Sequence, residues 1–278
     1  MKYFLILFSL CLTFSLKADI RDIPKRDINE INSLFERLIL AYDFGYTIFG
    51  SKPMSLADMC LKIPPNLPIH KYLKARFLLS KSKRRLNAWY KYRDKFNFKD
   101  FIFLDEEEKS PNCFVFILIN KKSMLNVLHE HKNAFKQELG ETFIPETFLE
   151  KIEKKEVSLA QATHDSQRLL GIMLGYGERN ATLFQERFDL LRECSKRKKD
   201  NLTQVNELSE KLIQVESQLG DFNDFEEEPI IPPLYFFADI THSETIELKQ
   251  TYANDRAKIE ELMKQPKFKN RVLKRLLE

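Results

Sequence analysis

Glycine is scarce in this chain, with seven among 278 residues, whereas phenylalanine occurs 23 times. Sheets joined by tight turns use glycine at many positions, so this composition disfavours an all-β fold and favours helices. Hydrophobic residues make up 43% and charged residues 31%, a balance typical of a chain that folds around an apolar core. The sequence therefore predicts a mainly α protein with a small antiparallel β-sheet (α+β), folded as a single helix-rich domain over residues 19–278.

A large excess of one charge is also missing. The chain has 45 basic and 41 acidic residues, and two of the basic ones, Lys2 and Lys17, lie in the N-terminal segment discussed next. Nucleic-acid-binding domains usually carry a clearly basic face, so a nucleic-acid partner is not expected. The charges are grouped in short runs, such as residues 81–85 and 196–199, which are typical of solvated helix surfaces. Such runs also suit a partner or headgroup of opposite charge.

Long apolar segments are absent after the first 16 residues. Lys2 precedes an uncharged, mostly apolar stretch over residues 3–16, and Ala18 provides a small residue for cleavage. At about 14 residues the stretch is shorter than the roughly 20 needed to span a bilayer. We therefore expect residues 1–18 to be a cleaved signal peptide, and the mature protein to be periplasmic or secreted.

Cysteine is rare, and three remain after Ala18, namely Cys60, Cys113 and Cys194. Export permits a disulfide, but an odd number leaves at least one thiol without a partner in the same chain. The sequence leaves open which two, if any, are bridged.

Two segments are dense in Phe, Ile and Val and flank a polar stretch that contains Pro111, a pattern typical of a β-hairpin. They cover residues 98–104 and 113–119. Because 113–119 is apolar at every position, both faces of that strand are expected to be covered. Residues 234–238 follow two prolines and are expected to add a third strand to this sheet.

Helical spacing of apolar residues accounts for most of the remaining chain. Helices are expected over residues 28–42, 55–61, 69–95, 121–139, 145–154, 158–176, 244–264 and 267–277. Residues 178–219 contain no glycine or proline, and a polar stretch at 192–201 interrupts their apolar spacing. One long helix and a hairpin bent near Asp200 are both compatible with this pattern. We favour an antiparallel helical hairpin or coiled-coil arm.

No catalytic, cofactor-binding or metal-ligating residue is predicted. The closest histidine pair, His129 and His131, is two residues apart, so on a helix the rings point in different directions. Cys194 lies among basic residues but has no histidine near it in sequence. Gly171 and Gly175 are spaced to admit a neighbouring helix, and Gly177 is expected to end its helix in a left-handed cap.

Three segments, AYDFGYTIFGSKPMSL at 41–56, LGYGERNA at 174–181 and PLYFFAD at 233–239, resemble motifs shared by uncharacterised exported proteins of obligate intracellular bacteria. The resemblance implies a bacterial protein that is periplasmic, surface-attached or delivered to a host. It implies no activity, and no functional residue can be carried over from it.

The leading functional hypothesis is an exported, non-enzymatic interaction or structural protein that binds another protein through the helical arm. One alternative is an exported hydrolase, which requires His70, His129 or His164 beside a carboxylate and a nucleophile. The other is peripheral membrane attachment through the basic C-terminal helix, whose apolar side contains Val272, Leu273 and Leu276. The sequence leaves the oligomeric state open.

Overall fold

The structure is a computed structural model of the chain and describes residues 20–63, 66–107, 113–197, 202–223 and 230–278. The expected signal peptide therefore lies outside the described residues. The chain divides into two compact units, which are described separately below. Unit 1 comprises residues 1–34 and 63–97, and unit 2 comprises residues 35–62 and 98–278. The prediction of one domain over residues 19–278 stays a prediction.

Unit 1 is helical. It contains the 3₁₀ helix η1 (Ile20–Asp22), the first part of α1 (Lys25–Ala41), α3 (Ile69–Tyr92) and the 3₁₀ turn η2 (Arg93–Lys95). The C-terminal half of α3 is the buried half, with Leu86 only 2% and Trp89 only 3% exposed. Lys91 lies 3.7 Å from the Asp27 carboxylate, which connects this half to α1. The prediction of a long helix over 69–95 is therefore confirmed.

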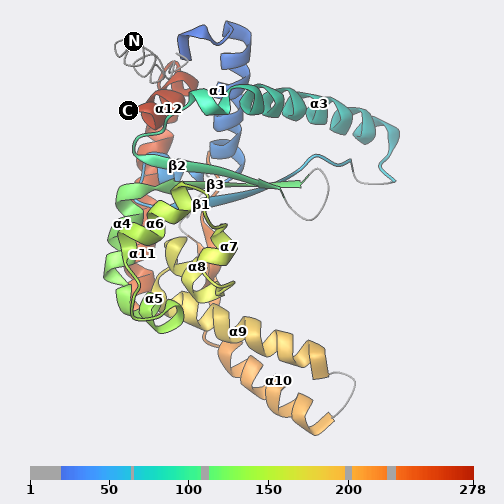
Figure 1. Cartoon of the computed structure of the whole chain (residues 1–278). Helices are drawn as coiled ribbons and strands as arrows, with labels where there is room; N and C mark the ends of the chain where they lie inside the picture. The colour runs from blue at the N-terminus through green and yellow to red at the C-terminus, as the bar shows by residue number, and fades with distance from the viewer. Residues whose placement is uncertain (1–19, 64–65, 108–112, 198–201, 224–229) are drawn as a thin grey trace, which may run out of the picture. The chain divides into compact units, whose positions relative to one another are not determined.

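Unit 2 is built on a three-stranded antiparallel sheet in the order β1-β3-β2 (Figure 1). Its strands are β1 (Met54–Cys60), β2 (Phe101–Glu107) and β3 (Cys113–Asn120). The antiparallel pairing of β2 with β3 confirms the predicted hairpin. A separate two-stranded sheet pairs β4 (Gly220–Asn223) with β5 (Tyr235–Ala238).

Two predictions about the sheet were wrong. Residues 55–61, expected as a helix, form most of β1, and residues 234–238 pair with β4 instead of joining the hairpin. The β1 segment is short, and Leu56, Ala57 and Met59 favour helix by propensity. Its pairing along the whole of β3 overrides that preference. Phe222 is the one strongly apolar residue of β4, so the sequence gives little indication of this partner strand.

The strand β3 is covered on both faces, as its uniformly apolar sequence predicted. Ile117 and Ile119 point into a core formed with Met124 and Leu128 of the next helix. On the alternate positions, the Phe116 ring stacks on that of Phe103 at a centroid distance of 5.7 Å. Residues from Phe116 to Ile119 are all at most 1% exposed. The period of two along a strand thus divides one apolar run between two cores.

The helices that follow β3 cover one face of the sheet (Figure 1). They are α4 (Lys121–Glu130), α5 (Lys132–Leu139), α6 (Pro145–Glu153), α7 (Leu159–Ala162) and α8 (Gln167–Met173). Two of the predicted helices are each broken into two. The break in residues 158–176 lies at His164 and Asp165, which both have positive φ. The Ser158 hydroxyl forms a capping box with Gln161 at the start of α7.

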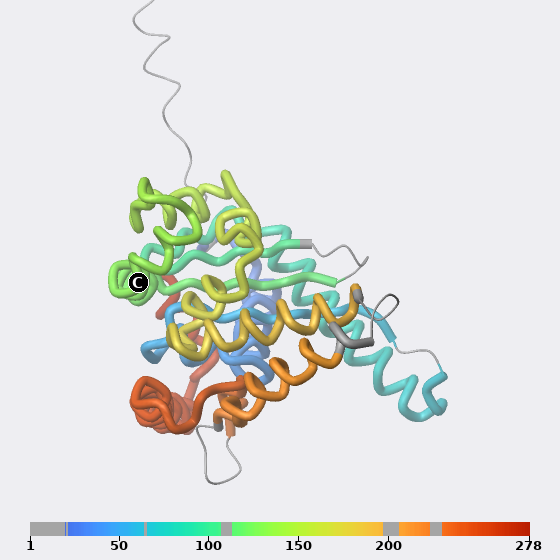
Figure 2. Tube along the Cα trace, turned by 90° about the horizontal axis from the view of Figure 1, so that it is seen from below, coloured from blue at the N-terminus to red at the C-terminus, as the bar shows by residue number. Residues whose placement is uncertain are grey.

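Residues 178–197 and 202–216 form the two helices of the predicted hairpin, and the expected bend near Asp200 lies outside the described residues. The helices are α9 (Glu178–Arg197) and α10 (Leu202–Glu216), which lie side by side (Figure 2). Arg187 on α9 is 3.0 Å from the Glu216 carboxylate, and Arg179 donates to the Gln218 side chain just beyond α10. These pairs show that the helices run antiparallel. Coiled-coil packing in this arm stays a prediction.

Three further helices complete unit 2. The short α2 (Phe44–Ile48) is buried at every position, and α11 (Ser243–Lys264) and α12 (Phe268–Leu277) end the chain. The apolar side of α12 is buried, with Val272 and Leu276 at 0% exposed. That side is therefore not available to enter a membrane in this fold. Within the described residues, no helix is long and apolar enough to cross a bilayer.

Cys60 and Cys113 form a disulfide across the ends of β1 and β3, where the two residues are directly paired. Their Cα atoms are 4.1 Å apart, and 53 positions separate them in sequence. Cys194, on α9, is a free thiol. The bridge closes a long loop that contains α3, so it restricts the unfolded chain strongly.

Candidate functional site

The three segments singled out in the sequence meet around one buried lysine in unit 2. Lys52 lies in the turn between α2 and β1, and its side chain is 0% exposed. Its ammonium donates to the backbone carbonyl of Leu174 at 2.7 Å and to that of Met54 at 2.5 Å. The carboxylate of Asp43 lies 3.2 Å away. Residues 41–56 are thus tied directly to residues 174–181.

The surroundings of Lys52 identify it as a structural group. Burial lowers the pKa of its ammonium, while the Asp43 carboxylate opposes that shift. An ammonium has three hydrogens, and two carbonyls and one carboxylate occupy their directions. The Tyr176 ring lies below it, with the nitrogen 5.2 Å from the ring centroid. Because no donor or lone pair is left free, Lys52 connects segments and is not placed to act as a nucleophile.

A stack of aromatic rings extends from this lysine to the third segment. Tyr176 stacks on Phe236 of β5 at 4.1 Å between centroids, and Phe236 stacks on Phe222 of β4 at 4.2 Å. Tyr252 of α11 meets Phe222 edge-on, and Tyr46 of α2 meets Tyr252 edge-on. Such contacts add about 0.5–1.5 kcal/mol each beyond the area they bury. The stack therefore connects the two-stranded sheet to α2 and α11.

The chain between α8 and α9 depends on glycine. Gly175 has a φ of +77°, and the amides of Gly175 and Tyr176 donate back to Ile172 and Gly171, which forms a Schellman cap. The left-handed cap of this helix is thus Gly175 and not Gly177. The Tyr252 hydroxyl donates to the Gly175 carbonyl at 2.6 Å. A Cβ atom added at residue 175 would overlap that hydroxyl.

Polar side chains fix the start of α9. Glu244 of α11 accepts hydrogen bonds from the amides of Glu178 and Arg179 at 2.8 and 3.1 Å. A carboxylate here satisfies helix amides that have no partner within the helix. Asn180, 1% exposed, donates to the Tyr176 carbonyl and accepts from the Asp239 amide. These bonds attach residues 174–181 to residues 233–239.

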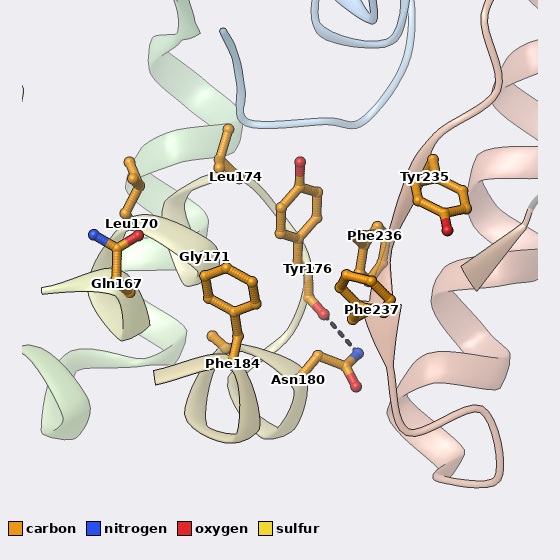
Figure 3. Close-up of a pocket in the computed structure, with 11 residues that line it drawn as sticks. Gln167, Leu170, Gly171, Leu174, Tyr176, Asn180, Phe184, Tyr235, Phe236 and Phe237 are labelled. Atoms are coloured by element: carbon orange, nitrogen blue, oxygen red, sulfur yellow. Dashed lines mark hydrogen bonds between the residues drawn. The ribbon is translucent and has the colours of Figure 1, made fainter. Parts of the chain in front are cut away.

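A cavity of about 340 Å³ lies beside this framework, between α8, α9 and β5 (Figure 3). Apolar and aromatic side chains form most of its wall. Gln167 and Asn180 contribute amides, and the Asn180 amide is already bonded to the Tyr176 carbonyl. Its lining consists of Gln167, Leu170, Gly171, Leu174, Tyr176, Asn180, Ala181, Phe184, Tyr235, Phe236 and Phe237. A site of this size and composition suits an apolar or aromatic group rather than an ionic one.

The apolar surface continues from the cavity onto the helical arm. Phe184, Phe188 and Leu191 are spaced by four and three residues, so they form one stripe along α9. Phe188 is 40% and Leu191 36% exposed. On β5, Tyr235 and Phe237 are the outward-facing residues, and the Arg187 guanidinium lies over the Phe237 ring. Exposed aromatics beside an apolar cavity are typical of a binding surface.

The histidines of the hydrolase hypothesis occupy different surroundings. The His129 ring lies 2.8 Å from the exposed Glu146 carboxylate, and His164 lines a different cavity between α5, α6 and α7. His70 is exposed on α3. Among the cavities of the described residues, none that we find places two of these rings together with a nucleophile.

An ion-pair network that the sequence did not indicate surrounds Glu178. Its carboxylate lies 3.1 Å from the His131 ring and 2.6 Å from the Arg168 guanidinium. Burial raises the pKa of Glu178, but hydrogen bonds from His131 and Arg168 outweigh burial and hold the pKa below its ordinary value. The network joins the turn between α4 and α5 to α8 and α9. In the part of the chain that the structure describes, no three His, Cys, Asp or Glu side chains are grouped to hold a metal ion.

No protein-family model, curated protein or solved structure matches the chain.

Lys52 and the cavity were not predicted, although the sequence contains a signal for the lysine. Lys52 is the only charged residue between Asp43 and Asp58, in a stretch dense in Phe, Tyr and Ile. A single charge in such a stretch is expected to be buried with a partner. No comparable signal exists for the cavity, because its walls come from segments that are distant in sequence.

Proposed function

We propose that this protein is an exported, non-enzymatic binding protein, and that the cavity between α8, α9 and β5 takes an apolar side chain of a partner protein. The observation that carries the proposal is the continuity of the cavity with exposed aromatic surface on Phe188, Tyr235 and Phe237. Aromatic anchors seated in apolar pockets dominate the energetics of many protein interfaces.

The framework around the cavity supports binding rather than chemistry. The nearby ionisable groups already have partners: Lys52 is fully bonded, and Glu244 caps a helix. The buried aromatic stack holds Tyr176 and Phe236 in place, so this part of the cavity wall is formed before any partner arrives. A preformed wall lowers the entropic cost of binding.

Export is supported by the disulfide between Cys60 and Cys113, since such bridges persist mainly in oxidising compartments. We infer that residues 1–18 are removed as a signal peptide and that the mature chain is periplasmic or secreted. The test is the intact mass of the protein from cell fractions, before and after thiol alkylation. A chain starting at Asp19 with one alkylated thiol supports export, whereas a reduced chain that still includes Met1 contradicts it.

The binding proposal is tested by filling the cavity. Leu170 is half-buried in the wall, so Leu170→Trp places a larger side chain in the cavity without removing a fully buried core residue. Tagged full-length wild type, Leu170→Trp and Ile246→Ala are expressed in the native cell, and the captured proteins are compared. Ile246, 57% exposed on α11 and not part of the cavity, provides the control.

The proposal predicts that one partner is retained by wild type and by Ile246→Ala and lost by Leu170→Trp. Titration calorimetry with that purified partner should then show at least a tenfold weaker Kd for Leu170→Trp. Equal capture by all three proteins refutes the role of the cavity. Native mass spectrometry tests the other outcome. If wild type carries a small apolar molecule that Leu170→Trp lacks, and all protein partners remain bound to both, then the cavity is a small-molecule site and not a protein-binding site.

A further inference from the structure

The first half of α3 exposes an apolar surface that the rest of unit 1 does not cover. Ile69 is 73%, Leu73 58% and Phe77 58% exposed, and the four-residue spacing places all three on one stripe. Tyr72 and Leu78 add further exposed apolar surface, at 39% and 52%. Single exposed apolar residues are ordinary, but five within ten residues of one helix are not.

The same helix carries charge of a single sign. Its 24 residues include eight Lys or Arg and no Asp or Glu. Two of the eight, Arg84 and Lys91, lie 4.0 and 3.7 Å from carboxylates on α1. Lys71, Lys74 and Arg76 are exposed, and within the described residues no salt bridge is found for them.

The second half of α3 holds the first half in helical form. A helix of about 12 residues is marginal by itself in water, because its first turn is costly to nucleate. Here the buried residues Leu86, Trp89 and Tyr92 fix the C-terminal turns, and the exposed turns continue from them. The exposed half is therefore a preformed basic and apolar helix.

We propose that residues 69–83 of α3 bind the surface of a membrane that contains anionic lipid. Basic helices with exposed Phe, Leu and Ile lie in the headgroup region, where the apolar side chains enter the acyl boundary and the cations meet lipid phosphates. The Lys81 ammonium lies over the Phe77 ring, 4.4 Å from its centroid, so a cation is held directly beside the apolar stripe.

The apolar stripe favours a lipid surface over an acidic protein segment. An acidic segment would pair with the cations and leave Ile69, Leu73 and Phe77 in water. A bilayer that contains anionic headgroups satisfies both the charges and the apolar side chains. This inference is independent of the cavity, which lies in unit 2.

The experiment is flotation of the purified mature chain with vesicles of phosphatidylcholine alone or mixed with phosphatidylglycerol. Each cation near an anionic surface contributes about fivefold to affinity, so Lys71→Gln/Lys74→Gln/Arg76→Gln should weaken binding to the mixed vesicles about a hundredfold. Leu73→Ser/Phe77→Ser should also lose binding, at unchanged net charge. Lys264→Gln/Lys267→Gln/Lys274→Gln removes as many exposed cations from the C-terminal helices and should bind like wild type.

Fluorescence of Trp89, the sole tryptophan and only 3% exposed, verifies that each variant keeps unit 1 folded. Binding that is equal with and without phosphatidylglycerol overturns the proposal. So does a C-terminal control variant whose vesicle binding weakens as much as that of Lys71→Gln/Lys74→Gln/Arg76→Gln. A third overturning result is tight binding to polyglutamate that Leu73→Ser/Phe77→Ser leaves unchanged, since an acidic polypeptide would then be the partner.

Discussion

Replacing Lys52 with methionine tests whether the buried ammonium holds the segments of unit 2 together. Methionine nearly preserves the length and volume of the side chain but removes the charge and every hydrogen-bond donor. The carbonyls of Met54 and Leu174 then lose their donor, and the partly buried Asp43 carboxylate loses its counter-charge. Removing one member of a buried ion pair costs about 3–5 kcal/mol, and we expect Lys52→Met to lose that much stability.

A double-mutant cycle separates the ion pair from the loss of packing. In an Asp43→Asn background no carboxylate is left without a counter-charge, so Lys52→Met should cost at least about 1 kcal/mol less than in wild type. Lys264→Met is the matched control. Lys264 is 65% exposed, and its salt bridge found within the described residues is to exposed Glu261, so its replacement should change stability by less than about 0.5 kcal/mol.

The assay is urea denaturation followed by far-UV circular dichroism, with Trp89 fluorescence as a separate signal from unit 1. The expected result for Lys52→Met is a lower midpoint in the circular dichroism curve. A shift no larger than that of Lys264→Met would refute the structural role assigned to Lys52. If Lys52→Met lowers the free energy of unfolding by the same amount in the Asp43→Asn background, then the two carbonyls, and not the carboxylate, account for the loss.

Three further predictions concern the disulfide, a glycine and the acid stability of the fold. Cys60→Ser/Cys113→Ser should lower the free energy of unfolding by about 4 kcal/mol, measured in urea, because 53 positions separate the bridged residues; an unchanged midpoint contradicts this. Gly175→Ala should cost more than Gly140→Ala in thermal melts, since both glycines have positive φ but only the Cβ at 175 meets other atoms; equal losses would remove the packing argument. Because the pKa of Glu178 is held below its ordinary 4.5, its contribution is present above that pH and lost as pH falls through the lower folded value. Glu178→Gln should therefore reduce the fall in the free energy of unfolding as the pH drops below 4.5, and an unchanged fall would contradict the assignment.

Local sequence patterns predicted the elements that local chemistry determines. The β2–β3 hairpin, the long helix α3 and the antiparallel arm follow from periodicity and from the placement of glycine and proline. The double coverage of β3 was also predictable, because a strand apolar at every position must bury both faces.

Features that depend on distant segments could not be predicted. Residues 54–60 become a strand only because β3 presents a complete pairing edge. The choice of Cys60 and Cys113 as the bridged pair follows from that register, which no spacing in the sequence specifies. Gly175 and not Gly177 caps α8, and the distant residue Tyr252 of α11 donates to the Gly175 carbonyl. The cavity likewise exists only once β5 has paired with β4.

The measurement that tests the central claim most directly is photo-crosslinking from the cavity in the native cell. Benzoylphenylalanine is placed at Phe237, in the cavity wall, and in a second protein at Ile246, on α11 away from it. The account predicts one protein adduct from position 237, none of the same mass from position 246, and loss of the adduct when Leu170→Trp fills the cavity. The same adduct from both positions, or from position 237 regardless of Leu170→Trp, would contradict it.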